Sequence, residues 1–190
     1  MSRKKGNDLI PGPPVDLSFK CINSMADVLL EDPREGLKPL KRCENGTLRS
    51  QAVRLNNNTL TDLQGFGETV GKLLSDPQQL SWIDLSFNDL PNIDPVLTTY
   101  PLLSVLNLHG NSISQLSEVD KLASLPNLKS LTLHGNPIES EKGYRNYILS
   151  VLPQLKSLDF SGVTKQERAT ADVWRRMNTK PKRPKTTKDE

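Results

Sequence analysis

Hydrophobic residues recur along this chain at fixed short spacings, and polar residues recur between them. Three segments follow the pattern L-x-x-L-x-L-x-x-N-x-L, beginning at Leu80, Leu103 and Leu128, with isoleucine at some of the leucine positions. A weaker copy before them has Ser50 in place of the first leucine. The asparagines of the four copies stand at positions 58, 88, 111 and 136, so the repeats are 30, 23 and 25 residues long. This spacing indicates a solenoid of stacked units.

Each copy predicts one short strand that lies parallel to the strand of the next copy. One copy cannot shield its leucines from water alone, so neighbouring copies must share a core. The asparagine turns the chain out of the strand, because its amide can bond to backbone groups that the bend leaves bare. A further strand starts near Leu155 and Leu158. We therefore predict an α/β solenoid, a right-handed leucine-rich-repeat horseshoe with about five parallel strands.

The spacers between the strands predict a convex side made of helices or 3-10 turns. Apolar residues at helical intervals predict a first convex helix within residues 62–75. A short helix over Ser24–Glu31 is expected to cover the open edge of the first strand. After the last strand, Thr164 and Glu167 form a T-x-x-E capping box. This box predicts a closing helix that lies across the last strand and holds Trp174 in the cap.

Basic residues and prolines are concentrated at both ends of the chain. Residues 175–190 hold seven basic and two acidic side chains, which gives +5, and residues 1–20 hold four and two, which gives +2. The other 14 basic and 18 acidic residues give −4, in agreement with the total of +3. We divide the chain into five segments: a flexible basic and proline-rich arm (1–20), an N-terminal capping segment (21–47), the repeats (48–143), the last repeat with a C-terminal cap (144–177) and a basic, disordered tail (178–190).

The composition argues against several classes of protein. No run approaches the ~18 apolar residues of a membrane span, and the start of the chain has no signal-peptide core. We therefore expect an intracellular protein that does not bind membranes, with Cys21 and Cys43 reduced. The sequence has no glycine-rich phosphate loop, no nucleophile motif and no paired cysteine and histidine. We therefore predict that it is not an enzyme.

The residues between the strand leucines are expected to line the concave face, because side chains alternate between the two faces of a strand. They form three columns across the repeats. The first column holds Ala52, Trp82, Val105, Ser130 and Ser157; the second holds Arg54, Asp84, Asn107, Thr132 and Asp159; the third holds Asn56, Ser86, His109, His134 and Ser161. We predict that these columns bind a helix or a short extended segment of a partner protein.

Two features of the columns suggest specific chemistry. Trp82 next to Val105 is the predicted anchor for a partner, since aromatic side chains dominate interface energetics. The alternative is that Trp82 lies flat on the strand beneath a neighbour or the N-terminal arm. His109 and His134 are the only two histidines and stand one repeat apart, so they could share a metal ion. No third ligand is apparent beyond Asp84. We therefore predict neither a metal nor a cofactor.

The segments that flank the strands resemble a known family. The pattern L-P-x-L precedes strands at residues 125–128 and 152–155, and Tyr144–Arg168 is similar to a C-terminal cap shared by several repeat proteins. With the repeats, these segments resemble the SDS22-like class of intracellular leucine-rich-repeat proteins. That class includes a phosphatase regulator, the U2 small nuclear ribonucleoprotein A-prime protein and several axonemal proteins. The resemblance implies a small cytoplasmic protein without enzymatic activity, and its relatives are often built into cilia.

We favour a structural adaptor that binds a partner on its concave face, as a monomer within a larger complex, in the cytoplasm or a ciliary axoneme. Its basic tail would add attraction to an acidic surface such as tubulin tails, or act as a nuclear import signal; the tail residues are Arg175, Arg176, Lys180, Lys182, Arg183 and Lys185. The alternative is a ribonucleoprotein subunit of the U2 A-prime type, whose basic arms reach phosphate. Direct contact of the body with nucleic acid is not expected, because residues 21–174 are net negative. Phosphatase regulation is a third reading that rests on the class name alone.

Overall fold

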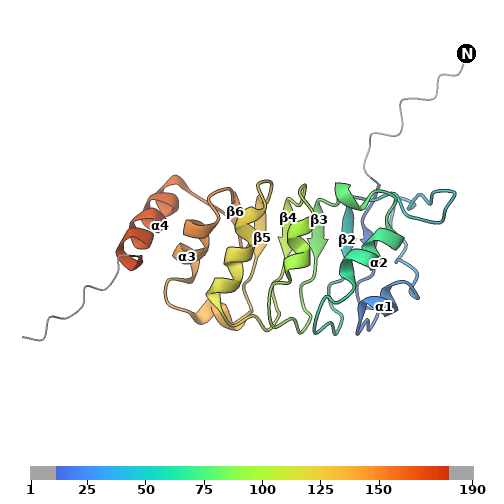
Figure 1. Ribbon diagram of the computed structural model, residues 1–190, viewed down its shortest axis with the longest axis horizontal. Coiled ribbons are helices and arrows are strands. Elements are labelled where there is room, and N and C mark those ends of the chain that lie inside the picture. Colours follow the sequence, from blue (N-terminus) through green and yellow to red (C-terminus); the bar gives the residue numbers. More distant parts are fainter. Residues whose placement is uncertain (1–11, 180–190) are drawn as a thin grey trace, which may run out of the picture.

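The computed structural model describes residues 12–179, which form a solenoid around one continuous sheet (Figure 1). Strands pair in chain order, parallel from β1 to β6 and antiparallel between β6 and β7. The strands are β1 (Val15–Asp16), β2 (Ala52–Arg54), β3 (Trp82–Asp84), β4 (Val105–Asn107), β5 (Ser130–Thr132), β6 (Ser157–Leu158) and β7 (Ser161–Gly162). The predicted α/β leucine-rich-repeat solenoid is confirmed, with six parallel strands in place of about five.

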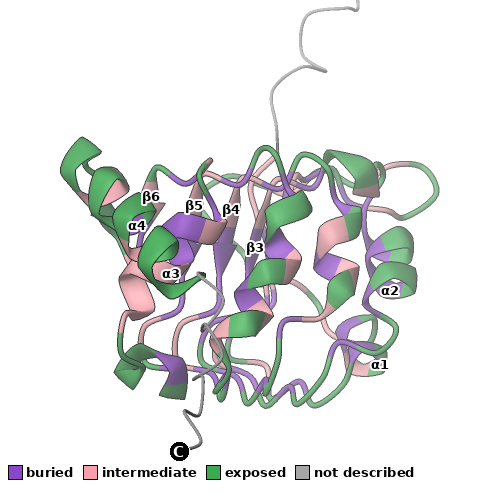
Figure 2. Ribbon diagram, turned by 60° about the vertical axis from the view of Figure 1, so that its left-hand side comes forward, coloured by how far each residue is buried: buried purple, intermediate pink, exposed green. Residues whose placement is uncertain are grey.

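One row of apolar residues runs through the centre of the sheet. The register places Val53 beside Ile83, followed by Leu106, Leu131 and Leu158, and each of these side chains is fully buried. Burial of one such side chain contributes about 1.5–3 kcal/mol. The row faces the convex helices, whose buried positions are turned toward the sheet (Figure 2). The core therefore lies between the sheet and the convex side.

The convex side combines α-helices with 3-10 helices, as predicted. These elements are α2 (Phe66–Leu73), η1 (Pro77–Gln79), η2 (Pro95–Thr99), η3 (Leu116–Ser124), η4 (Pro137–Ser140) and α3 (Tyr144–Val151). The first convex helix lies within the predicted range of 62–75 and buries Phe66 and Val70. A 3-10 helix is narrower than an α-helix, which suits the shorter spacers of the middle repeats.

The repeat asparagines are buried and join neighbouring repeats. Asn88 donates from Nδ2 to the carbonyl oxygens of Leu85 and Leu55, both at 3.0 Å, and its Oδ1 accepts from Leu60 N at 3.0 Å. Asn111 and Asn136 make the same set of bonds one and two repeats later. Each amide therefore satisfies its own turn and the turn of the preceding repeat, as the sequence pattern indicates.

The N-terminal end corrects two predictions. The arm predicted over residues 1–20 is wrong for its last part, because Val15 and Leu17 are fully buried and β1 pairs with β2. The predicted helix over Ser24–Glu31 is limited to α1 (Met25–Val28), which contacts α2 and does not cover the edge of β2. The apolar side chains of β1 pack into the shared core, so this segment folds as an additional repeat strand. The part of the arm at residues 1–11 lies outside the described residues.

The outer edge of β1 is closed by the loop that follows α1. The backbone N–H of Arg34 donates to the Asp16 carbonyl at 2.7 Å, and its guanidinium donates to the Ser18 carbonyl at 3.3 Å. The Ser18 N–H is in turn satisfied by the Asp16 carboxylate at 3.0 Å. An edge whose groups are occupied in this way cannot readily pair with another chain.

The C-terminal end forms a hairpin and a closing helix, α4 (Lys165–Asn178). Its capping box is confirmed: Thr164 Oγ1 accepts from Glu167 N at 3.1 Å, and the Glu167 carboxylate accepts from Thr164 N at 2.8 Å. The predicted position across the last strand is wrong, because α4 packs against α3. Its indole Trp174 meets Tyr147 edge to face at 6.1 Å and covers Gly143, where a Cβ would lie 2.9 Å from the ring.

Arg168 ties α4 to the end of α3. Its Nη1 donates to the carbonyl oxygens of Leu149 at 2.7 Å and Leu152 at 3.1 Å, and its Nη2 donates to that of Leu155. The last carbonyls of a helix have no partner inside the helix. One guanidinium therefore satisfies two of them, and a carbonyl of the following turn, at once.

Replacing Arg168 by methionine keeps the aliphatic stem and removes the donors. We expect the free energy of unfolding to fall by about 2 kcal/mol, because half-buried carbonyls lose a charged donor, and urea unfolding would measure the change. Lys165→Met is the matched control, since Lys165 is exposed on the same helix, and should change stability by less than about 0.5 kcal/mol. Equal stability of the Arg168→Met protein and the wild type would contradict this role.

Candidate functional site

The sheet brings the predicted columns together on the concave face. The register places Ala52, Trp82, Val105, Ser130 and Ser157 side by side. It does the same for Arg54, Asp84, Asn107 and Thr132. Asp159 extends this second column, because its Oδ1 accepts from Leu133 N at 2.7 Å and His134 N at 3.0 Å.

The third column ends earlier than predicted. Ser161 does not follow His134, because it lies in β7, which runs antiparallel to β6. The reversal is made at Asp159 and Phe160, whose φ angles of 52° and 61° are left-handed. This conformation turns the chain back where an asparagine turn would otherwise carry it outward, and it places Phe160 next to His134.

The second column is a connected polar network. Asp84 Oδ1 accepts from Ser86 N at 3.0 Å and from Ser86 Oγ at 2.6 Å, and Asp84 Oδ2 accepts from Asn107 Nδ2 at 3.3 Å. Asn107 is linked to Thr132 Oγ1 at 3.5 Å, and that hydroxyl is 2.7 Å from His109 Nδ1. These five buried or half-buried hydrogen bonds hold the side chains in fixed positions. The face is therefore rigid before any partner arrives.

Unpaired polar atoms gather at β2 and β3. Among the described residues, three buried side-chain nitrogen or oxygen atoms have no hydrogen-bond partner: Arg54 Nε, Asn56 Oδ1 and Trp82 Nε1. All three belong to the predicted columns. Each such atom costs free energy and is unusual in a folded protein. Trp82 itself is half-buried between Ala52 and Val105, so its ring is accessible from the concave side.

His109 and His134 stack on each other. Their ring centroids are 4.6 Å apart and their planes differ by 7°. Burial lowers the pKa of His109, the neighbouring His134 lowers it further, and Asp84 and Asp159 partly offset these effects. His134 Nδ1 lies 3.2 Å from Asp159 Oδ1. Within residues 12–179, no cluster of three or more histidine, cysteine or acidic side chains could hold a metal ion.

Two exposed phenylalanines flank the histidines and were missed by the sequence analysis. Phe87 meets His109 edge to face at 5.1 Å, and Phe160 lies 5.5 Å from His109 and 5.6 Å from His134. Phe87 is 52% exposed and Phe160 is 68% exposed. We call Phe87, His109, His134 and Phe160 the aromatic strip. Its two histidines belong to the third column, and Phe87 and Phe160 lie beside them at the carboxyl ends of the strands.

The backbone of Phe87 is unusual for its residue type. Its φ of 53° is left-handed, as are those of Asn57, Gly110 and Gly135 at the same position of the other repeats. Asparagine and glycine adopt this conformation easily, whereas for a bulky side chain it is a rare outlier. Gly110 makes room for the ring, because a Cβ there would lie 2.6 Å from the Phe87 ring. Such outliers cluster at functional sites.

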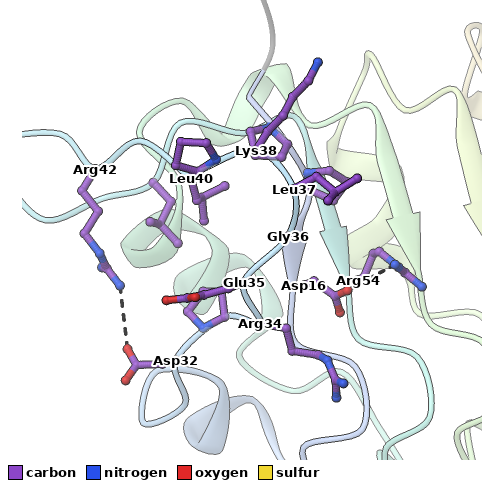
Figure 3. Close-up of a pocket in the computed structure, with 15 residues that line it drawn as sticks. Asp16, Asp32, Arg34, Glu35, Gly36, Leu37, Lys38, Leu40, Arg42 and Arg54 are labelled. Carbon is purple, nitrogen blue, oxygen red and sulfur yellow. Dashed lines mark hydrogen bonds and ion pairs between the residues drawn. The ribbon is translucent and has the colours of Figure 1, made fainter.

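A separate hollow of about 870 Å³ lies at the N-terminal end of the concave face (Figure 3). The loop at 32–42 forms one wall, and Asp16 and Arg54 of the sheet form another. Opposite charges inside it are paired, Arg54 with Asp16 at 3.2 Å and Arg42 with Asp32 at 3.8 Å. Leu37 stands fully exposed on the loop. The hollow continues the second column past β2.

The predicted basic tail is described only in part. Arg175 and Arg176 are exposed in the last turn of α4, where Arg175 Nη1 donates to the Ser150 carbonyl at 3.3 Å. The other predicted tail residues lie outside the described residues, namely Lys180, Lys182, Arg183 and Lys185. None of the helices between residues 12 and 179 has the length and apolar content needed to span a bilayer.

Comparison with known proteins agrees with this architecture. A family model described as "Leucine-rich repeat" matches residues 51–186. The chain belongs to the leucine-rich-repeat family. It is 57% identical to leucine-rich repeat-containing protein 51 of Homo sapiens, over 93% of this chain and 92% of that protein, and 58% identical to the Bos taurus protein of that name over the same shares.

More distant relatives of this leucine-rich-repeat chain include a small nuclear ribonucleoprotein component. The U2 small nuclear ribonucleoprotein A' of Mycosarcoma maydis is 36% identical, over 81% of this chain and 60% of that protein. The crystal structure of the Drosophila melanogaster SNF/U2A' complex contains a similar chain, with a TM-score of 0.56 and 27% identity over 65% of this chain and 67% of that one.

The lowered pKa of His109 predicts a pH dependence of stability. Below the ordinary pKa of 6.5, the imidazole takes up a proton more readily in the unfolded chain than in the folded protein. The contribution of neutral His109 to the free energy of unfolding is therefore fully present above about pH 6.5 and is lost as the pH decreases. We expect urea unfolding to show a smaller loss between about pH 7.5 and 5.5 for His109→Gln than for the wild type. Equal losses in the two proteins would contradict the assignment.

Proposed function

We propose that this protein is a non-enzymatic scaffold that binds a helix or peptide of a partner protein on its concave face. The observation that carries the proposal is the concave surface of β2 to β5. It combines a fixed polar network, a half-buried Trp82 and three polar atoms that have no partner among the described residues. Repeat proteins of this architecture use their extended concave surfaces for binding.

The dimensions of the sheet suit one polypeptide segment. Six parallel strands at ~4.8 Å spacing span roughly 24 Å across the strands. A helix is ~10 Å wide with its side chains, so one helix, or an extended segment that crosses the strands, fits the face. Both closed ends of the solenoid favour a monomer that joins a larger complex, since neither edge is left open for self-association.

The cellular setting is part of the same proposal. We place the protein in the cytoplasm, with a structural role in a ciliary or axonemal assembly, on the basis of its similarity to the SDS22-like class. The basic side chains of the tail would add attraction to an acidic surface such as tubulin tails. This contribution should weaken with salt, because exposed charges are screened over about 10 Å at 0.1 M.

A ribonucleoprotein role is the second candidate. It is supported by the likeness to U2 small nuclear ribonucleoprotein A' and to a chain of the SNF/U2A' complex. In this case the concave face would hold an RNA-binding protein, and the basic tail would reach phosphate or direct nuclear import. Direct RNA contact by the concave face is disfavoured by its carboxylates Asp84 and Asp159. Phosphatase regulation remains the weakest candidate, because it rests on class membership alone.

Partner capture from ciliated cells would test the proposal. We expect Trp82→Ala combined with Asn107→Ala to remove most captured protein, whereas Ser124→Ala, on the exposed convex side, should capture as the wild type does. Asn107 is buried, so its replacement could disturb the fold as well as binding. Ser130→Trp is therefore a second variant, which places a bulky side chain in the first column and leaves the polar network intact. Melting temperatures would verify folding.

Ciliary proteins lost in both concave variants would support the scaffold. Spliceosomal proteins lost in both concave variants, together with RNA lost on removal of residues 180–190, would support the ribonucleoprotein role. Partners that are retained in every variant would contradict binding through the concave face.

A further inference from the structure

The middle repeats carry a one-sided charge. Residues 73–120 contain six carboxylates and no lysine or arginine. The carboxylates are Asp76, Asp84, Asp89, Asp94, Glu118 and Asp120. The same stretch supplies β3, β4 and two members of the aromatic strip, Phe87 and His109. Asp76, Asp94, Glu118 and Asp120 belong to the convex 3-10 segments, where Glu118 pairs with Lys121 at 2.6 Å. Asp84 and Asp89 are the two that flank Phe87 in the sequence. Carboxylates beside aromatic rings attract a positively charged ligand.

A short motif occurs twice on the sheet with the same local structure. The sequence Asp-Leu-Ser-Phe stands at residues 16–19 and again at 84–87. In both copies the serine donates to the aspartate Oδ1 from its backbone N at 3.0 Å and from its Oγ at 2.6 Å. In both copies the backbone of the phenylalanine has a left-handed conformation, with φ of 57° at Phe19 and 53° at Phe87. Both rings are largely exposed, at 62% and 52%.

The first copy of the motif already holds arginine. The guanidinium of Arg34 lies over the Phe19 ring at 5.8 Å from its centroid, and Arg54 pairs with Asp16 at 3.2 Å. Among residues 12–179, no guanidinium or ammonium lies over the ring of Phe87 or Phe160. The second copy therefore repeats the aspartate and the ring of the first copy. The neutral amide of Asn107 takes the position of Arg54 and donates to Asp84 Oδ2 at 3.3 Å, so neither β3 nor β4 supplies a cation to this copy.

We propose that the aromatic strip, together with Asp84 and Asp89, is a docking surface for arginine side chains of the partner segment that binds the concave face. This inference rests on the proposed scaffold function and specifies the chemistry of its partner, a basic polypeptide. The exposed rings at Phe87 and Phe160 take the faces of the guanidinium groups, the exposed Asp89 offers a carboxylate to pair with them, and the buried Asp84 adds negative charge beneath the surface. The proposal also accounts for the left-handed phenylalanines, because asparagine or glycine would make the same turn with less strain.

Fluorescence anisotropy with short labelled peptides tests the proposal directly. The probe is a peptide of alternating arginine and alanine, and its matched control has citrulline, which keeps the shape and removes the charge. We expect the wild type to bind the arginine peptide at low salt and the citrulline peptide at least tenfold more weakly. Phe87→Leu combined with Phe160→Leu should weaken binding of the arginine peptide roughly fivefold or more, since each cation–π contact corresponds to about a 2- to 5-fold change.

Phe19→Leu is the matched control for these variants. Phe19 has the same motif and backbone conformation as Phe87 and a similar exposure, but its ring already contacts the guanidinium of Arg34. The affinity of Phe19→Leu for the arginine peptide should therefore stay within about twofold of the wild type. Asp89→Asn, at an exposed position, provides a further variant that leaves the rings in place, and it should weaken binding in a salt-dependent manner. Unchanged melting temperatures would show that all variants fold.

Four results would overturn the proposal. Equal binding of the citrulline peptide would show that the peptide charge is not recognised. Wild-type affinity in the double phenylalanine variant would show that general charge attraction suffices. A large gain in affinity on removal of residues 180–190 would show that the chain's own basic tail occupies the strip. Retention of cellular partners by the strip variants, with their loss in Ser130→Trp, would refute the strip alone and leave the scaffold function standing.

Discussion

The buried asparagine of each repeat is the interaction on which the rest of the structure depends. Its amide pairs with carbonyls of its own turn and of the preceding repeat, and its carbonyl oxygen accepts from the backbone of that repeat. Because every turn is fixed to the one before it, the strands stay in register and their leucines share one core. The side chains of the concave face are therefore presented at regular intervals of ~4.8 Å, which is the property that a binding surface for one extended partner requires.

The two ends of the solenoid show how the same constraint is met where no further repeat follows. At the C-terminal end, Asp159 accepts from two backbone N–H groups of the preceding repeat and from Tyr144 Oη at 2.7 Å. The chain then reverses, and Arg168 satisfies the carbonyls at the end of α3. At the N-terminal end, β1 and Arg34 occupy the open edge. Both ends of the sheet are thus occupied by the chain itself, and the concave face and its rim are left for the partner that we propose.

Most of the fold could be predicted from the spacing of leucine and asparagine, because that spacing reflects the core directly. The strand β1 could not, since Gly12 stands where the first leucine of a repeat belongs and the prolines beside it suggested a free arm. The structure explains the substitution: Gly12 lies against the Arg49 carbonyl, where a side chain has no room. The columns followed from strand alternation. The aromatic strip did not, because it depends on left-handed backbone at Phe87 and Phe160, which the leucine pattern does not encode.

Photo-crosslinking from the concave face tests the central claim most directly. A benzophenone amino acid at Ser130, in the first column, would be compared in ciliated cells with the same group at Ala123, which is exposed on the convex η3. We expect one major protein adduct from Ser130, reduced by an excess of the arginine peptide, and little from Ala123. Adducts that form from Ala123 and not from Ser130 would place the partner on the convex side and contradict the account.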